Sequence, residues 1–295
     1  MKDQLVKAYA FNDNARVYVA TTTQLVSHAQ VIHDCWPTAS AALGRFLTGA
    51  VIMGAMHKGA LNHNDTELTL RIDANGPIEG MVVTTNALGH VRGYVGNPHV
   101  FMQYNNGKLN VKAVVGEGHL HVTKDLKVKE IFTSSVPLIS GEIAEDFAYY
   151  YTASEQIPSA VSLGVLVNDD HTVLAAGGII IQMLPGHKEA DIIAAENALH
   201  ALPSLSDLVH QGLSAHDILQ RLTHDHTLLE TMPLSYTCDC HREKFEKGLM
   251  TLGAQELRKM IAEDGKIETT CHFCMNRETF DENAVEALII ESTKT

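Results

Sequence analysis

Four of the five cysteines in this chain form two short pairs near the C-terminus. Cys238 and Cys240 are separated by one residue, and Cys271 and Cys274 by two. Zinc prefers four soft ligands in a tetrahedron, and two cysteine pairs supply them once residues 241–270 fold and bring the pairs together. The sequence therefore predicts one metal site. Its C-x-C half differs from the C-x-x-C of an ordinary zinc knuckle and narrows the candidate families.

Composition limits the remaining function classes. A chain of 295 residues with 45% hydrophobic content is long enough for two domains. Its net charge of -13 disfavours a nucleic-acid partner, because binding to phosphates depends on clustered Lys and Arg. Residues 1–22 alternate polar and apolar side chains without the apolar core of a signal peptide, so we expect a cytoplasmic protein. The most apolar stretch, Ala39–Met56, contains Arg45 and is short for a bilayer, which predicts a buried helix and no membrane span.

Strand and helix patterns are grouped along residues 1–178 and do not alternate strictly. Helical periodicity covers Thr23–Cys35 and Ser40–Lys58. The apolar runs Val161–Val167 and Val173–Met183 flank a polar turn, which indicates a β-hairpin. We therefore predict an α+β domain over residues 1–178, with a largely antiparallel sheet and packed helices.

Two further segments follow that domain. Residues 179–232 carry Leu and Ile at helical spacing among many acids, which predicts a helical linker whose apolar face packs on the core. Residues 233–295 form the predicted zinc-binding module. A module of this size has a thin core, and such domains commonly depend on a metal. Acids outnumber bases in it, so a zinc ribbon that contacts nucleic acid lacks the expected basic surface.

Four thiolates on one metal allow three functions. The spacing alone favours a constitutive structural site, since most closed four-cysteine zinc sites are structural. A redox switch is the second. Local disulfides, Cys238 with Cys240 and Cys271 with Cys274, would release zinc, and the two pairs would no longer be linked across residues 241–270. The third is a thiol-disulfide oxidoreductase centred on Cys271 and Cys274, although the residues after Cys274 lack the expected helix start.

Other reactive side chains favour structural interpretations. Cys35 is predicted to be a small buried hydrophobe, and His241 and His272 are expected to lie outside an all-thiolate shell. His119 and His121 alternate on a strand and are interpreted as exposed polar positions. The acids in residues 141–146 are interpreted as a helix N-terminus, where they suit the helix dipole. We identify no nucleophile elbow, Walker loop or dinucleotide motif, so no catalytic residue is assigned.

Several sequence blocks resemble the redox-regulated heat-shock chaperone family, the 33-kDa chaperonins. They are TCDCHREK at 237–244, Leu252-Gly253, CHFC at 271–274 with Phe280-Asp281, and GEIAEDFAYYYTASEQIPSAVSLGV at 141–165. The resemblance covers nearly the whole chain and includes all four predicted ligand positions.

The resemblance implies a chaperone and not an enzyme. It implies that Cys238, Cys240, Cys271 and Cys274 bind one Zn²⁺ per chain in the reduced, inactive protein. Oxidants together with unfolding conditions would form a disulfide within each pair, eject zinc and unfold the module and linker. The oxidised protein would dimerise and hold unfolding client proteins without ATP during oxidative stress. These implications favour the switch over the structural zinc site.

Overall fold

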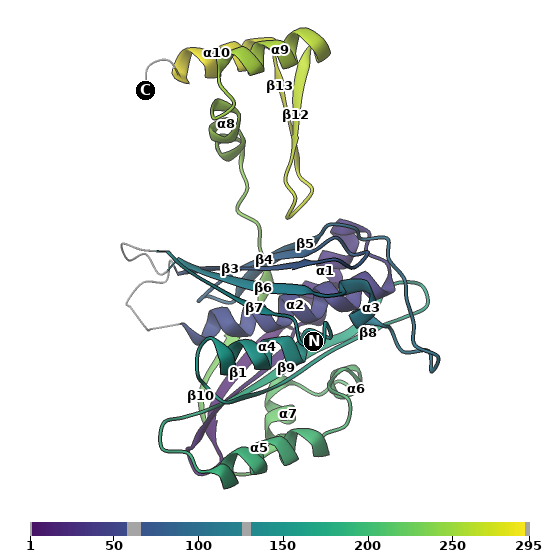
Figure 1. Cartoon of the computed structure of the whole chain (residues 1–295), viewed down its shortest axis with the longest axis vertical. Coiled ribbons are helices and arrows are strands. Elements are labelled where there is room, and N and C mark those ends of the chain that lie inside the picture. Colours follow the sequence, from purple (N-terminus) through teal and green to yellow (C-terminus); the bar gives the residue numbers. More distant parts are fainter. Residues whose placement is uncertain (1, 58–65, 126–130, 293–295) are drawn as a thin grey trace. The chain divides into compact units, whose positions relative to one another are not determined.

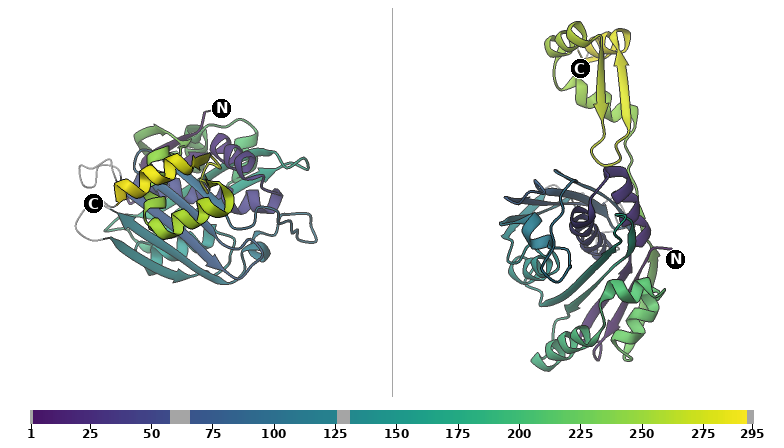
Figure 2. Two further views of the ribbon diagram at one scale, coloured as in Figure 1. Left: turned by 90° about the horizontal axis from the view of Figure 1, so that it is seen from above. Right: turned by 90° about the vertical axis from the view of Figure 1, so that its right-hand side faces the viewer.

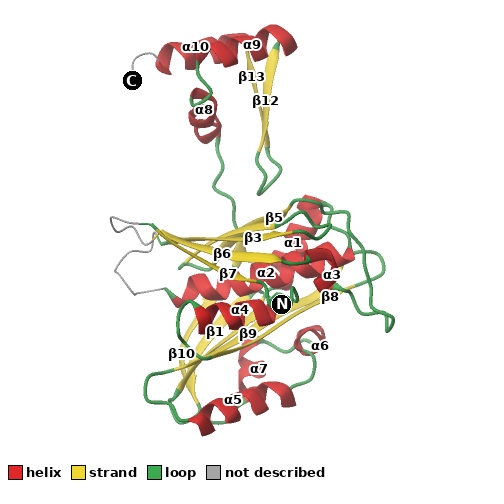
Figure 3. Ribbon diagram, in the orientation of Figure 1, coloured by secondary structure: helices red, strands yellow, loops and turns green. Residues whose placement is uncertain are grey.

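The computed structural model describes residues 2–57, 66–125 and 131–292. The chain divides into two compact units, Met1–Thr237 and Cys238–Thr295. Strand pairing among the described residues is antiparallel apart from one short parallel pair, and helices accompany each unit (Figure 3). The predicted α+β class is confirmed. The finer boundaries at 178/179 and 232/233 stay a prediction.

The first unit contains a five-stranded sheet built from three distant parts of the chain. Its strands are β1 (Gln4–Ala10), β2 (Ala15–Thr21), β8 (Ser159–Val167), β9 (Val173–Met183) and β10 (His226–Pro233). Their order across the sheet is β10-β1-β2-β9-β8, and Figure 1 labels each of these strands except β2. The predicted hairpin is confirmed, because β8 and β9 pair from Ser159 opposite Gln182 to Val167 opposite Val173.

A second, six-stranded sheet completes the first unit. Its strands are β3 (Glu67–Ala74), β4 (Met81–Asn86), β5 (His90–Val95), β6 (Gly118–Asp125), β7 (Phe132–Pro137) and β11 (Ser235–Tyr236). The order is β11-β5-β4-β3-β6-β7, with β11 parallel to β5. Residues 226–236 therefore supply one strand to each sheet: β10 to the five-stranded sheet and β11 to the six-stranded sheet.

A long apolar helix lies between the two sheets (Figure 2). This helix, α2 (Pro37–Met56), begins with a proline at its first turn and packs on β4 and β5 on one side and on β8 and β9 on the other. It is long and apolar enough to cross a membrane, but 89% of its most apolar window is buried in the protein. The prediction of a buried helix is confirmed. Gly49 allows close packing, since a Cβ there would lie 2.4 Å from the ring of Phe147.

Shorter helices surround the central one. They are α1 (Thr23–His33), α3 (Val111–Val115) and α4 (Ala144–Ala153). The acids of residues 141–146 do mark a helix start: buried Asp146 accepts backbone N–H groups of Ile139, Ser140, Gly141 and Ile143 at 2.8–3.4 Å. The helix-terminus interpretation of this block is confirmed.

Three helices of the predicted linker cover the outer face of the five-stranded sheet. They are α5 (Glu189–Ala201), α6 (Leu205–His210) and α7 (Ala215–Leu222). Their buried apolar residues share one core with the outward side chains of β1, β2 and β9: Leu205, Leu208, Val209, Ile218, Leu219, Leu222, Val6, Val17, Val19, Ile179 and Ile181. The apolar face of the segment is therefore covered, as expected. Both ends of residues 179–232 are strands instead of helices, because β9 extends to Met183 and β10 pairs with the edge of β1.

Asp3 caps α1 from outside the helix. Its buried carboxylate accepts the N–H groups of Gln24 at 3.1 Å and Leu25 at 2.7 Å. Burial raises the pKa of Asp3 to about 6, although these two hydrogen bonds oppose the rise.

Stability should therefore fall as the pH rises from about 4 to 6, because the folded protein keeps a proton that the unfolded chain has lost. The difference amounts to about 3 kcal/mol of unfolding free energy. Asp3→Asn should remove this component, so its stability relative to the parent should improve between pH 4.5 and pH 7. Urea unfolding followed by Trp36 fluorescence measures this at both pH values, and parallel pH dependences of parent and variant would contradict it.

Candidate metal centre

The second unit is a small α+β module with its own core. Its elements are α8 (Arg242–Met250), α9 (Ala254–Asp264), β12 (Lys266–Thr270), β13 (Arg277–Asp281) and α10 (Glu282–Ser292). Seven buried side chains form the centre of this core: Leu249, Leu257, Ile267, Phe280, Val285, Leu288 and Ile289. So few large side chains supply limited burial energy. The module is of the size that commonly depends on an additional cross-link.

A hairpin positions the second cysteine pair. Strands β12 and β13 pair from Lys266 opposite Asp281 to Thr270 opposite Arg277, and residues 271–276 connect them. In this connection the N–H of Cys271 donates to the carbonyl of Asn276 at 2.9 Å, and the N–H of Met275 donates to the carbonyl of Cys271 at 2.8 Å. Met275 adopts a left-handed conformation with φ of 59°. The turn therefore holds both thiols at the end of the hairpin.

The first pair lies immediately before α8 and meets the second pair. The Sγ atoms of Cys238 and Cys271 are 3.7 Å apart, and those of Cys240 and Cys274 are 3.1 Å apart. All four Sγ atoms lie within 4.8 Å of one another. All five cysteines of the chain are free thiols. Four converging sulfurs at these distances could hold one metal ion, so the structure brings together every predicted ligand.

The environment of the four thiols is not uniform. Burial raises the pKa of Cys240, and the neighbouring thiols raise it further. Burial also acts to raise the pKa of Cys271, but the backbone N–H groups of Cys274 and Phe273 outweigh it and lower that pKa. Hydrogen bonds of this kind favour the thiolate, which is the form that ligates a metal.

The other candidate residues lie outside this cluster. His241 and His272 are exposed, and the Nδ1 of His241 lies 3.0 Å from the carbonyl of Asp239. Cys35 is fully buried in the first unit, where burial raises its pKa to about 12, so its prediction as a buried hydrophobe is confirmed. His119 is exposed on β6, whereas His121 is half-buried with its Nε2 atom 3.4 Å from Asp73. Within the described ranges, the four paired cysteines are the group identified as able to hold a metal.

Arg242 joins the two halves of the site, a role that no pattern in the sequence indicates. Its guanidinium lies 4.2 Å from the ring centre of the buried Phe280. Its Nη1 donates to the carboxylate of Glu278 and to the carbonyl of Thr279, each at 3.3 Å, and its Nε donates to Glu246 at 3.2 Å. Arg242 thereby joins the helix after the first cysteine pair to the strand after the second. The strand β13 was itself not predicted.

Arg242→Ala should destabilise the metal-loaded module by about 1.5 kcal/mol, because it removes a cation–π contact and three hydrogen bonds at once. Arg258→Ala is the matched control: Arg258 makes one exposed ion pair with Glu286, at 3.0 Å, and its loss should lower stability by less than about 0.5 kcal/mol. Hydrogen exchange of the β12 and β13 amides measures both changes. Equal effects of the two substitutions would contradict the prediction that Arg242 stabilises the module more than Arg258 does.

Comparisons with known proteins place the whole chain in one family. The family model described as "Hsp33 protein" matches residues 3–281. A 33 kDa chaperonin of Geobacillus kaustophilus is 49% identical over 292 residues, which is 98% of each chain. The 33 kDa chaperonin of Bacillus subtilis is 44% identical over 295 residues, covering 99% of this chain and all of that one.

A solved structure agrees with these relatives. The crystal structure of a 33 kDa chaperonin (heat shock protein 33 homolog) from Thermotoga maritima has a TM-score of 0.90 and 36% sequence identity, with both chains covered completely. The resemblance found in the sequence blocks is confirmed. The chain belongs to the Hsp33 family of 33 kDa chaperonins, and it is a chaperone and not an enzyme.

Proposed function

We propose that the protein is an ATP-independent holdase whose activity is switched on by oxidation of its four-thiolate metal site. The observation that carries this proposal is the placement of Cys238, Cys240, Cys271 and Cys274 within 4.8 Å of one another in a chain of the Hsp33 family. In the reduced, inactive state these thiolates hold one Zn²⁺ per chain. The protein acts in the cytoplasm on unfolding client proteins, and neither nucleic acid nor membrane takes part.

The donor set suits zinc. Thiolates at about 2.3 Å from a tetrahedral Zn²⁺ lie about 3.8 Å from one another, and the Sγ atoms of Cys238 and Cys271 are separated by 3.7 Å. The Cys240 and Cys274 Sγ atoms, at 3.1 Å, need to separate by a few tenths of an ångström. Bound zinc supplies folding free energy to a module whose own core is small.

Oxidation removes the ligands. Two thiolates transfer two electrons to a peroxide, which takes up two protons and leaves as water, while the sulfurs form one disulfide and release the metal. We propose disulfides within each pair, Cys238–Cys240 and Cys271–Cys274. Sulfurs that are neighbours in sequence remain close in an unfolded module, whereas a crosswise bond must close the loop of residues 241–270 at an entropic cost.

Loss of the module then spreads to the linker helices. Helices α5, α6 and α7 hide an apolar face against the five-stranded sheet, and their release would expose apolar surface on both the helices and the sheet. A contiguous exposed apolar surface is what binds unfolded chains. The oxidised protein would dimerise through part of this surface and hold clients with the rest.

The test follows aggregation of a heat-unfolding client protein, with zinc release measured in parallel. The reduced, zinc-loaded protein should give little protection, and peroxide at elevated temperature should give protection together with release of one zinc per chain. Peptide mapping of the oxidised protein should find bonds within the pairs. Equal protection before and after oxidation would indicate a constitutive structural site, and catalytic turnover of a dithiol substrate would indicate an oxidoreductase.

A further inference from the structure

A large groove in the first unit follows the outer edge of the five-stranded sheet. Its cavity volume is about 1010 Å³. Six consecutive residues line it: Leu163 to Val167 in β8 and Asn168, which follows the strand. Side chains of a strand point alternately to the two faces of its sheet, so a cavity that touches consecutive residues lies along the strand edge and not over one face.

The edge of β8 offers free hydrogen-bonding groups. β8 is the last strand of the sheet and pairs only with β9 in the described part of the chain. Among the described residues, the backbone groups of Ala160 to Val167 form no hydrogen bond outside the β8–β9 ladder. An unpaired strand edge is a template for another extended chain.

The two walls of the groove differ in chemistry. One wall is aromatic: Trp36, Phe101 and Tyr104 are 40–49% exposed, and the groove also contacts Leu163 and Val165, which are buried on the α2 side of the sheet. The other wall is polar and comes from the start of α6. There Ser206 approaches the sheet so closely that a Cβ on Gly164 would lie 2.9 Å from its backbone nitrogen.

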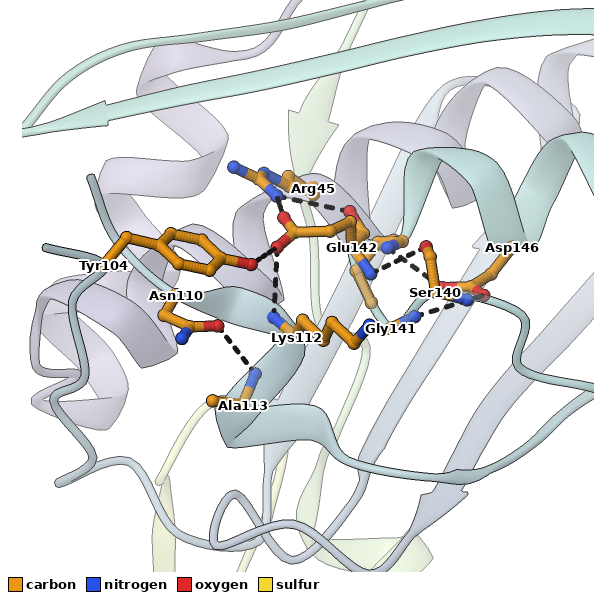
Figure 4. A network of polar contacts seen from close by, with 10 residues as sticks. Arg45, Tyr104, Asn110, Lys112, Ala113, Ser140, Gly141, Glu142 and Asp146 are labelled. Carbon is orange, nitrogen blue, oxygen red and sulfur yellow. Dashed lines mark hydrogen bonds and ion pairs between the residues drawn. The ribbon is translucent and has the colours of Figure 1, made fainter. Parts of the chain in front are cut away.

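Arg45, Tyr104 and Glu142 line the groove and contact one another, as Figure 4 shows. The Nη1 of Arg45 donates to the Glu142 carboxylate at 2.6 Å, and the hydroxyl of Tyr104 donates to the same carboxylate at 2.7 Å. These contacts neutralise Arg45 and hold Tyr104 in place. With Arg45 and Glu142 paired, the lining of the groove in the described residues still presents the exposed carboxylates of Asp169 and Asp207 and the exposed amine of Lys108. These two carboxylates, Asp207 in α6 and Asp169 in the turn between β8 and β9, favour a basic partner.

We propose that this groove binds one extended segment of an unfolded client as an added strand along β8. Main-chain hydrogen bonds to β8 give affinity for many sequences, and alternate side chains enter the two walls. Apolar side chains face Trp36 and Phe101, while Lys or Arg side chains face Asp169 and Asp207. A second folded copy is the less suitable occupant, because its edge strand would bring flanking helices into a slot already walled on both sides. The inference rests on the proposed function in one respect, namely that the bound segment belongs to a client protein.

Trp36 provides a direct probe, since it is the single tryptophan of the chain and lines the groove. The experiment titrates the reduced, metal-loaded, full-length protein with an acetylated, amidated nine-residue peptide of alternating Val and Lys or Thr. Trp36 emission should change with saturation. Two further peptides carry N-methyl groups on alternate residues, one on the odd and one on the even positions. At least one of them should fail to bind, because its N-methyl groups replace the N–H groups that would form hydrogen bonds with β8.

Two exposed phenylalanines give a matched pair of variants. Phe101→Ser, in the groove, should weaken peptide binding about tenfold. Phe132→Ser removes a ring of similar exposure, 53% against 49%, from β7 outside the groove and should leave binding unchanged. Asp207→Lys should weaken the Lys peptide several-fold and strengthen binding of the same peptide with Glu in place of Lys.

Three results would overturn the inference. The first is no change in Trp36 emission; the second is full binding of both N-methylated peptides; the third is concentration-dependent dimerisation that the peptide reverses, which would assign the edge to a second copy. Failure of the proposed redox switch is separate from these outcomes, because it is measured by zinc release and client aggregation in the parent protein. A short peptide bound at Trp36 needs neither oxidant nor metal release, whereas protection of a whole client also needs the apolar surface that α5, α6 and α7 cover in the reduced protein.

Discussion

Removal of the metal from the reduced protein is expected to unfold residues 238–292 while both sheets of the first unit stay folded. The module core consists of seven buried apolar side chains, whereas structural zinc contributes on the order of 10 kcal/mol to a module of this kind. Chelation, or Cys271→Ser, should therefore abolish amide protection in β12, β13 and the three helices of the module. Hydrogen exchange read by mass spectrometry measures every segment in one experiment.

Cys35→Ala is the matched control for the cysteine substitution. Cys35 is fully buried in the first unit and is not part of the four-sulfur cluster. Its replacement should leave the module protected and the metal bound, at the expense of a small loss of core packing in the first unit. Full protection of residues 238–292 after chelation would show that the module folds without a metal.

Ile218→Asp is expected to produce a chaperone that protects clients without oxidation. Ile218 is 0% exposed in the core shared by α7 and the five-stranded sheet. A carboxylate there loses the apolar contact and cannot stay charged in that environment, which costs roughly 4 kcal/mol. Helices α5 to α7 should then open locally, and the reduced, metal-loaded protein should suppress aggregation of a heat-unfolding client.

Ile193→Asp makes the same chemical change at an exposed position. Ile193 lies on α5 and is 50% exposed, so the reduced variant should resemble the parent protein in both protection of clients and hydrogen exchange. The prediction about Ile218 fails if its variant retains full amide protection in residues 189–222, or if those residues open and clients still aggregate. The second result would place client binding elsewhere.

Local patterns in the sequence predicted the elements that do not depend on a distant partner. Two apolar runs around a polar turn defined the hairpin of β8 and β9, and the apolar Ala39–Met56 defined a buried helix; both are confirmed. The four cysteines were identified because thiolate chemistry and spacing limit the alternatives. Their convergence to within 4.8 Å agrees with that prediction.

Elements that form through distant pairing were missed. β10 contains Leu228 and Leu229 in succession, both exposed, so it lacks the alternation of a half-buried strand and is fixed by pairing with β1. The two residues of β11 are a strand only because they lie beside β5. The contacts of Arg242 depend on how α8 meets β13. The groove along β8 likewise depends on helices more than a hundred residues apart in sequence.

The anchoring of Tyr236 has a consequence for how far a change at the cysteines extends. The Tyr236 hydroxyl donates to the carbonyl of Gly93 at 3.0 Å, and only Thr237 separates it from Cys238. One residue therefore lies between the anchored strand β11 and the first cysteine. If β11 and β10 detach in sequence, β5 and β1 each become a terminal strand, so one event replaces the edge strand of both sheets. The stretch 226–236 thus covers the edges of β5 and β1, which would otherwise be open to pairing with another chain.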